Sequence, residues 1–162
     1  MEKTIYILDA YAFIYRSYYA FQNKPLVNSK GFNVSSIFGF FKSLHSLVKT
    51  YQPSYFVVAL DSKVPTFRHE MYEEYKANRK KTPEDLHAQI PFIIDILKAI
   101  GFETCYFDRF EADDIIASIT KKAINLGFAV RIISSDKDLL QLSSPDVEMV
   151  RQDIHGKWNI YK

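Results

Sequence analysis

The side chains of this sequence with the clearest chemical potential are carboxylates at the ends of short apolar segments. The stretch FEADDIIASI places Glu111, Asp113 and Asp114 within four residues. Like charges about 4 Å apart repel by on the order of 4 kcal/mol at an effective dielectric near 20. The full set of candidate carboxylates is Asp9, Asp61, Glu111, Asp113, Asp114, Asp136 and Asp138. If these side chains converge in space, cations must neutralise them.

Each acid also has a purely structural interpretation. Acidic residues in the first turn of a helix complement the helix dipole, by about 0.3–1 kcal/mol each. Asp9 and Asp61 suit turns or helix caps, and Asp136 suits an N-cap with Asp138 in the turn that follows. For single residues these interpretations stay open, but several segments that deliver carboxylates to one place favour a functional cluster.

The candidate ligands are all oxygen atoms, which limits the metals they would hold. The chain has one cysteine, Cys105, and neither a Cys-x-x-Cys motif nor a Cys–His pairing, which disfavours zinc. The run Asp136-Lys137-Asp138 lacks the glycine and the distal glutamate of a calcium loop. Mg²⁺ or Mn²⁺ is therefore expected, and two such ions held by carboxylates suit in-line phosphoryl displacement.

A basic segment follows Asp61. Its positive side chains could offset the repulsion between the carboxylates and a bound phosphate. Arginine grips phosphate bidentately, and tyrosine can stack on an unpaired base. The alternative is a solvated helix with Glu–Lys pairs, because Glu70, Glu73 and Glu74 lie among the bases. The basic and aromatic residues of this segment are Arg68, Tyr72, Tyr75, Lys76, Arg79, Lys80 and Lys81.

The elements that must position these residues alternate between strands and helices. Apolar runs predict strands over 4–9, 55–61, 102–107 and 128–136, and two terminal strands over 147–150 and 157–161. Helical spacing predicts helices over 11–21, 34–51, 82–101 and 111–127, with a short helix over 137–142. Asn33 or Ser35 can cap the second helix, Thr82 the third, and Pro91 should kink or restart the third.

This alternation predicts an α/β fold: a three-layer, doubly wound, mostly parallel sheet with helices on both faces. In such sheets, sites form outside the carboxyl ends of the strands. Asp9, Asp61 and Asp136 each follow a predicted strand, so they should project from one edge. The length of 162 residues suits a single domain, 1–162.

Composition excludes several classes of protein. The net charge is only +2, so a nucleic-acid partner must be argued from local patches. The start MEKTIYILDAY has no apolar core of a signal peptide, and no apolar run reaches membrane-spanning length. A single cysteine permits no internal disulfide, which fits a reducing cytoplasm.

Four stretches carry a resemblance to a known family: ILDAYAFIYRSYYAF, FVVALDSKVPTFRHEMYEEYKANRKKTPEDL, FEADDIIASITKKA and VRIISSDKDLLQL. The chain resembles the amino-terminal part of the 5′-nuclease domain of bacterial DNA polymerase I, within the flap endonuclease family. The resemblance implies a PIN-like, flap-nuclease-like fold. It also implies cleavage of 5′-ended branched DNA and removal of RNA primers, with two divalent metals, Mg²⁺ or Mn²⁺.

The resemblance also implies roles for residues. The candidate carboxylates become metal ligands, and Lys76 and Arg79 contact or polarise the scissile phosphate. Arg16 and Arg68 contact phosphates, Tyr75 stacks on a terminal base, and Lys80 and Lys81 bind DNA. The basic segment, around 64–82, becomes an arch or clamp that admits the single-stranded 5′ end.

The resemblance leaves alternatives open. The family continues into a helix–three-turn–helix element that adds aspartates to the second metal site, and this chain stops at Lys162. A fragment that binds DNA with little turnover is therefore a second hypothesis, with polymerase domains in the same chain if it is a fragment. A phosphatase acting on small esters is a third, although Asp9 lacks the second aspartate of phosphoaspartate enzymes.

Overall fold

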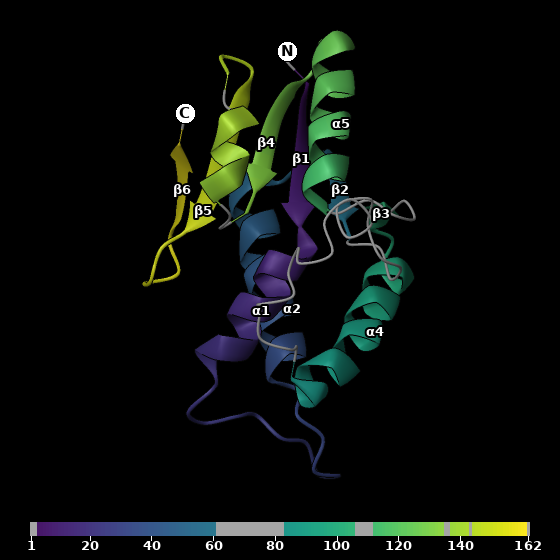
Figure 1. Ribbon diagram of the computed structural model, residues 1–162, viewed down its shortest axis with the longest axis vertical. Helices are drawn as coiled ribbons and strands as arrows, with labels where there is room; N and C mark the ends of the chain where they lie inside the picture. Colours follow the sequence, from purple (N-terminus) through teal and green to yellow (C-terminus); the bar gives the residue numbers. More distant parts are fainter. Residues whose placement is uncertain (1–2, 61–82, 106–111, 135–136, 143, 162) are drawn as a thin grey trace, which may run out of the picture.

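The protein is described by a computed structural model that covers residues 3–60, 83–105, 112–134, 137–142 and 144–161. Within these ranges one sheet of six strands has the order β3-β2-β1-β4-β5-β6 (Figure 1). All neighbouring pairs are parallel except β5 and β6, which are antiparallel. The strands are β1 (Thr4–Asp9), β2 (Tyr55–Ala59), β3 (Glu103–Cys105), β4 (Ala129–Ile133), β5 (Val147–Gln152) and β6 (Trp158–Tyr161).

The strand order reverses direction beside β1. The chain first builds outward through β2 and β3, and then returns to place β4 on the opposite side of β1. The register pairs Leu8 of β1 with Ile133 of β4. The carboxyl ends of β1 and β4 therefore form the topological switch point, where open α/β sheets commonly bind ligands.

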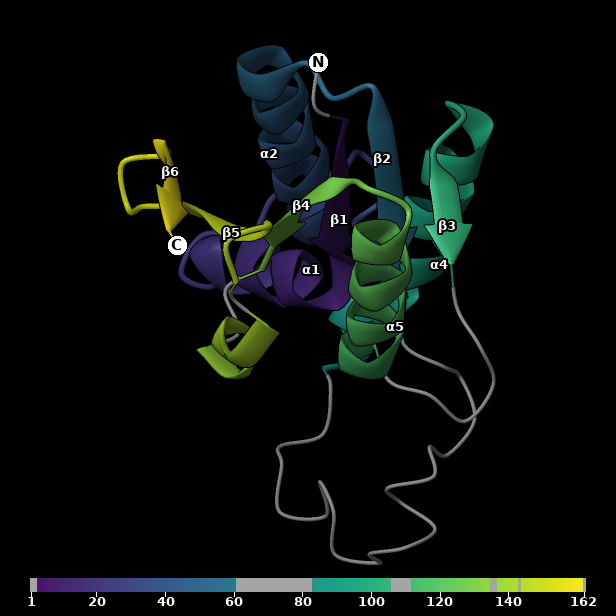
Figure 2. The ribbon, with the colours of Figure 1, turned by 90° about the horizontal axis from the view of Figure 1, so that it is seen from above.

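Helices cover both faces of the sheet because the strand side chains alternate between two apolar clusters. Tyr6 and Leu8 point into the cluster formed with α1, α2 and α4, whereas Ile7 belongs to the cluster formed with α5 and η1. Figure 2 shows α2 and α5 on opposite sides of β1. The helices are α1 (Ala10–Ala20), α2 (Ser35–Tyr51), α4 (Glu84–Ala99), α5 (Ala112–Asn125) and the short 3₁₀ helix η1 (Lys137–Leu142).

The predicted fold class is confirmed, and two details of the third predicted helix were wrong. α4 continues through Pro91 as one helix, so the proline does not restart it, whereas the alternative, a kink at Pro91, stays a prediction. Pro91 is exposed, while Leu86, Ile93 and Leu97 bury a continuous apolar face on either side of it. The helix also begins at Glu84, with Pro83 as the N-cap, and the predicted cap Thr82 lies outside the described residues.

A polar network fixes the starts of α2 and α4 relative to each other. The buried Gln89 of α4 accepts hydrogen bonds at Oε1 from the backbone N–H groups of Ser36 (2.8 Å) and Ile37 (3.2 Å). These donors belong to the first turn of α2 and have no partner within the helix. The N-cap of α2 is Val34, and Asn33 supports the turn by accepting from Ser35 N at 2.9 Å.

The carboxylate of Asp85 extends this network to α1. Tyr18 Oη donates to Asp85 Oδ1 at 2.7 Å, and Asn33 Nδ2 donates to Asp85 Oδ2 at 2.9 Å. The hydrogen bond from Tyr18 lowers the pKa of Asp85 below its ordinary value. The same bond, with burial, raises the pKa of Tyr18 to about 12. The start of α4, which follows the basic segment in the chain, is thus tied to α1 and α2.

We predict that the Tyr18–Asp85 bond stabilises the fold only between two pH limits. Because the pKa of Asp85 is lowered on folding, its contribution is complete above the ordinary value of 3.8 and disappears as the pH falls further. Because the pKa of Tyr18 is raised, its contribution is complete below 10.0 and disappears towards about 12. A double-mutant cycle of Tyr18→Phe and Asp85→Asn should give about 0.5 kcal/mol of coupling at pH 7 in this exposed position. Equal coupling at pH 2.5 would contradict the assignment.

Gly39 lets α1 and α2 approach closely, and we predict that Gly39→Ala destabilises the protein. A Cβ at this position would lie 2.8 Å from Ser17 Cβ. The overlap should cost about 1–3 kcal/mol, more than the helix propensity gained, about 1 kcal/mol. Chemical denaturation measures the effect, and adding Ser17→Gly should recover the part due to the overlap. A Gly39→Ala variant at least as stable as wild type would refute the prediction.

Candidate metal centre at the carboxyl edge of the sheet

Asp9 is the last residue of β1 and its side chain is buried, with 5% of the residue exposed. It also occupies the N-cap position of α1, but its carboxylate makes no capping hydrogen bond to that helix. The structural interpretation of Asp9 as a helix cap therefore does not account for its side chain. Burying a carboxylate is costly unless hydrogen bonds and charges compensate for it.

The carboxylate of Asp9 contacts β4 instead. Ser134 Oγ donates a hydrogen bond of 2.8 Å to Asp9 Oδ2. Ser134 directly follows β4 and is 1% exposed. The ladder between β1 and β4 ends where Leu8 pairs with Ile133, and Asp9 and Ser134 are the next residue on each side. The sequence analysis did not identify Ser134, and its one sequence signal is its position directly after an apolar strand.

Asp113 and Asp114 lie in the first turn of α5 and are half-buried. α5 packs through Ala112 and Ile116 into the buried cluster that also holds Ile7 of β1 and Ala59 of β2. The first turn of α5 is thus packed against β1, which ends at Asp9, and β2, which Asp61 follows in the chain.

The other predicted ligands cannot be placed. Asp61, Glu111 and Asp136 lie outside the described residues, as does the side chain of Asp138, whose backbone is in η1. In the part of the chain that is described, no group of three or more His, Cys, Asp and Glu side chains could hold a metal ion. The predicted convergence of all the carboxylates therefore stays a prediction.

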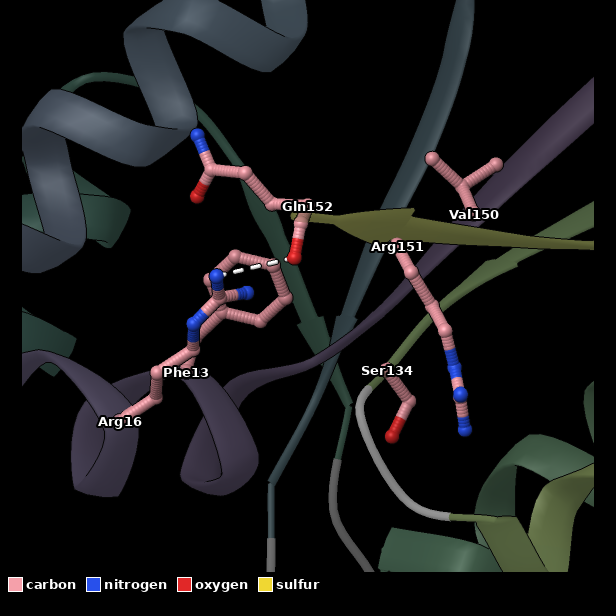
Figure 3. Close-up of a pocket in the computed structure, with 6 residues that line it drawn as sticks. All are labelled: Phe13, Arg16, Ser134, Val150, Arg151 and Gln152. Atoms are coloured by element: carbon pink, nitrogen blue, oxygen red, sulfur yellow. Dashed lines mark hydrogen bonds between the residues drawn. The ribbon is translucent and has the colours of Figure 1, made fainter. Parts of the chain in front are cut away.

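A cavity of about 180 Å³ adjoins Ser134 on the side of β5 (Figure 3). The residues that line it are Phe13, Arg16, Ser134, Val150, Arg151 and Gln152. It carries two arginines, of which the sequence analysis named only Arg16. A larger cavity, of about 370 Å³, shares Arg16 and is also lined by Lys42 and His155.

Arg16, predicted to contact phosphate, has a structural contact in this arrangement. Its Nη2 donates to the backbone carbonyls of Gln152 (2.9 Å) and Asp153 (3.2 Å), at the turn between β5 and β6. Figure 3 shows the guanidinium reaching from α1 to the Gln152 carbonyl. The other predicted DNA contacts, Arg68, Tyr75, Lys76, Arg79, Lys80 and Lys81, lie outside the described residues.

Comparison with known proteins assigns the family. Residues 4–162 match the family described as "5′-3′ exonuclease, N-terminal resolvase-like domain". The chain belongs to this family. It is therefore a 5′-3′ exonuclease domain, from a family of phosphodiester hydrolases.

Curated relatives of this exonuclease domain are longer proteins. The chain is 53% identical over 157 residues to DNA polymerase I of Treponema pallidum, covering 97% of this chain and 16% of that protein. It is 45% identical over 148 residues to the 5′-3′ exonuclease of Aquifex aeolicus, covering 91% of this chain and 50% of the relative. The chain thus spans half the length, or less, of these relatives.

Solved structures confirm the fold of the exonuclease domain. The phage T5 5′-exonuclease with divalent metal ions (zinc) bound has a TM-score of 0.71 and 26% identity, covering 97% of this chain and 58% of that one. The catalytic core of Rad2 in complex with a DNA substrate has a TM-score of 0.60 at 20% identity, covering 99% of this chain and 48% of that one, and supports the fold alone. Among the described helices, none has the length and apolar character needed to cross a bilayer.

The described donors fit a hard divalent cation by their chemistry. Asp9, Asp113 and Asp114 each offer carboxylate oxygens, which Mg²⁺ and Mn²⁺ prefer, but these three side chains do not by themselves form a group that could hold an ion. The donor to Asp9 from Ser134 is a neutral hydroxyl, which orients the carboxylate without neutralising it. A buried carboxylate in such surroundings is suited to receive a cation.

We predict that Asp9→Asn raises the stability of the metal-free exonuclease domain, by about 1 kcal/mol. The amide keeps an acceptor for Ser134 but removes the charge of a buried residue. Urea unfolding in EDTA measures the change, and excess Mn²⁺ should reverse the ranking, because only the wild type gains from binding. A loss of more than 1 kcal/mol in EDTA would show that Asp9 serves the fold rather than a cation.

Proposed function

We propose that this chain is a divalent-metal-dependent 5′-3′ exonuclease and flap endonuclease, which hydrolyses phosphodiesters near 5′ single-strand/duplex junctions in DNA. The observation that carries the proposal is the carboxylate of Asp9, buried at the switch point of a 5′-3′ exonuclease domain and not used to cap α1. The structure of the T5 relative with divalent metal ions bound supports a metal requirement.

The residues proposed to hold the cations are those predicted from the sequence. Asp9, Asp113 and Asp114 belong to elements anchored at one part of the sheet. Asp61, Glu111, Asp136 and Asp138 are proposed to complete the ligand set. A bound divalent cation supplies polarisation of a phosphoryl oxygen and activation of water for attack. The carboxylates would bind the cation and hold it in position. Their number would set the total negative charge around it.

The basic segment around 64–82 is proposed to handle the DNA. Lys76 and Arg79 would contact the scissile phosphate, and Tyr75 would stack on a terminal base. Arg68, Lys80, Lys81 and Arg16 would contact further phosphates. Arg16 can do so only with the donors not given to the β5–β6 turn, since Nη2 binds two carbonyls there. We propose one nuclease domain, 1–162, with this segment as an arch or clamp.

The proposed substrates are DNA with a 5′ flap and RNA primers paired to DNA, as expected for a nuclease unit of DNA polymerase I in replication and repair. The T5 relative is known in a pseudo-enzyme-product complex with DNA and metal ions, and Rad2 in complex with a DNA substrate. These complexes support a DNA partner without identifying this chain's preferred structure. The bacterial relatives support a cytoplasmic location as part of the proposal.

A second candidate is a DNA-binding unit with little turnover. It is favoured by one observation, that the chain spans 50% of the Aquifex aeolicus exonuclease. Binding without cleavage would follow if the remaining half of such a protein supplies metal ligands. Comparing flap binding with flap cleavage, with and without Mn²⁺, separates the two candidates.

We predict that Asp113→Asn slows single-turnover cleavage of a 5′-flap oligonucleotide by at least about 100-fold, because the cation loses a charged ligand. Lys76→Ala should slow cleavage by about 100-fold with an unchanged unfolding transition, because it removes a donor to the phosphate. Asp95→Asn is the matched control, since Asp95 is an exposed acid of α4 and is not one of the proposed ligands. A wild-type rate in Asp113→Asn would rule out the proposed metal site.

A further inference from the structure

The hydroxyl of Ser134 occupies a position that the fold specifies closely. β1 and β4 pair in parallel up to Leu8 and Ile133, and Asp9 and Ser134 are the residues that follow on each strand. Both residues are almost fully buried, and the hydrogen bond between them spans 125 positions in the chain. The bond therefore links the ends of the two strands at the point where the sheet reverses its order.

Ser134 borders the cavity as well as Asp9. Its side chain is one of the six residues that line the 180 Å³ cavity beside β5 (Figure 3). The residue that contacts the buried carboxylate therefore also borders this cavity.

A hydrogen bond to one oxygen of a carboxylate fixes the rotation of the carboxylate plane. Carboxylates that bind metals are commonly oriented in this way, and loss of the orienting partner lowers metal affinity by about 10–100-fold. A neutral donor suits this task, because it sets the direction of the oxygen atoms and leaves their charge in place. A lysine or arginine at the same position would compete with the cation for that charge.

From these observations we propose that Ser134 is a positioning residue for the metal centre: its hydroxyl holds the Asp9 carboxylate in the orientation that receives a divalent cation. This inference rests on the proposed function, because it assumes that Asp9 binds the cation. It adds a residue that is neither a metal ligand nor a DNA contact. Ser134 would act through Asp9 and would not touch the cation itself.

The test measures Mn²⁺ binding directly, by electron paramagnetic resonance of the free ion, in the protein without DNA. Ser134→Ala should weaken Mn²⁺ affinity by about 10–100-fold, whereas Ser134→Thr, which keeps the hydroxyl, should recover most of it. Unfolding of each variant in EDTA shows whether it is folded. Single-turnover cleavage at saturating and at limiting Mn²⁺ should show a defect that is largest at limiting metal.

Ser36→Ala is the matched control. Ser36 is also fully buried, and its Oγ donates a 2.8 Å hydrogen bond, to the Ile14 carbonyl in the core. It should lose comparable stability and keep Mn²⁺ affinity within about two-fold of wild type. If Ser134→Ala binds Mn²⁺ as wild type does, or no more weakly than Ser36→Ala, the positioning role is wrong.

The outcomes also separate this inference from the proposed function. If wild type binds Mn²⁺ and Asp9→Asn does not, the metal site holds, and Ser134→Ala alone decides the positioning role. If Asp9→Asn binds Mn²⁺ as well as wild type does, the metal site at Asp9 is wrong, and the role of Ser134 is overturned with it.

Discussion

A carboxylate buried at the end of a central parallel strand is the constraint around which this structure is arranged. Asp9 follows four residues of β1, from Ile5 to Leu8, whose side chains alternate between two apolar clusters. The strand therefore cannot shift by one residue to expose the acid without moving both clusters to the wrong faces. Hydrophobic packing on both sides holds Asp9 in place, and the cost of its burial is set against that packing.

The helices serve the same edge in different ways. α5 is positioned by the apolar side chains that follow its acidic first turn, so burial of Ile115 and Ile116 also places Asp113 and Asp114. α4 depends on polar contacts at its start, where Gln89 satisfies two N–H groups of α2. Loss of these hydrogen bonds would weaken the attachment of α4 to α2. The start of α4 is where the chain returns from the basic segment to the sheet.

Much of the fold could be predicted from the sequence because its signals are local. The strand over 4–9 and the helix over 34–51 are marked by apolar spacing, and the structure reproduces them to within one residue. The restart at Pro91 was wrong because packing on both sides of an exposed proline outweighs the lost hydrogen bond.

The candidate site could be predicted only in part, because its contacts are distant in sequence. The partner of Asp9 lies 125 residues away, and that of Arg16 lies 136 residues away. A serine after a strand carries no signal by itself, and a family motif identifies an arginine without showing that its Nη2 holds a turn. Such pairings follow from the parallel register and from packing, which a single sequence does not contain.

Orientation and neutralisation of charge are separate tasks at the proposed metal centre, and we propose that Ser134 performs the first and a cation the second. A hydroxyl can orient a carboxylate, but it does not remove the negative charge of that carboxylate. If Asp9 binds the cation as proposed, stability of the metal-free chain and affinity for the cation are opposed, because the same charge would weaken one and create the other. At Ser134 they act together, because one hydrogen bond satisfies a buried oxygen and also orients it. A metal centre built this way can be rigid before the cation arrives, since its geometry depends on the pairing of β1 with β4.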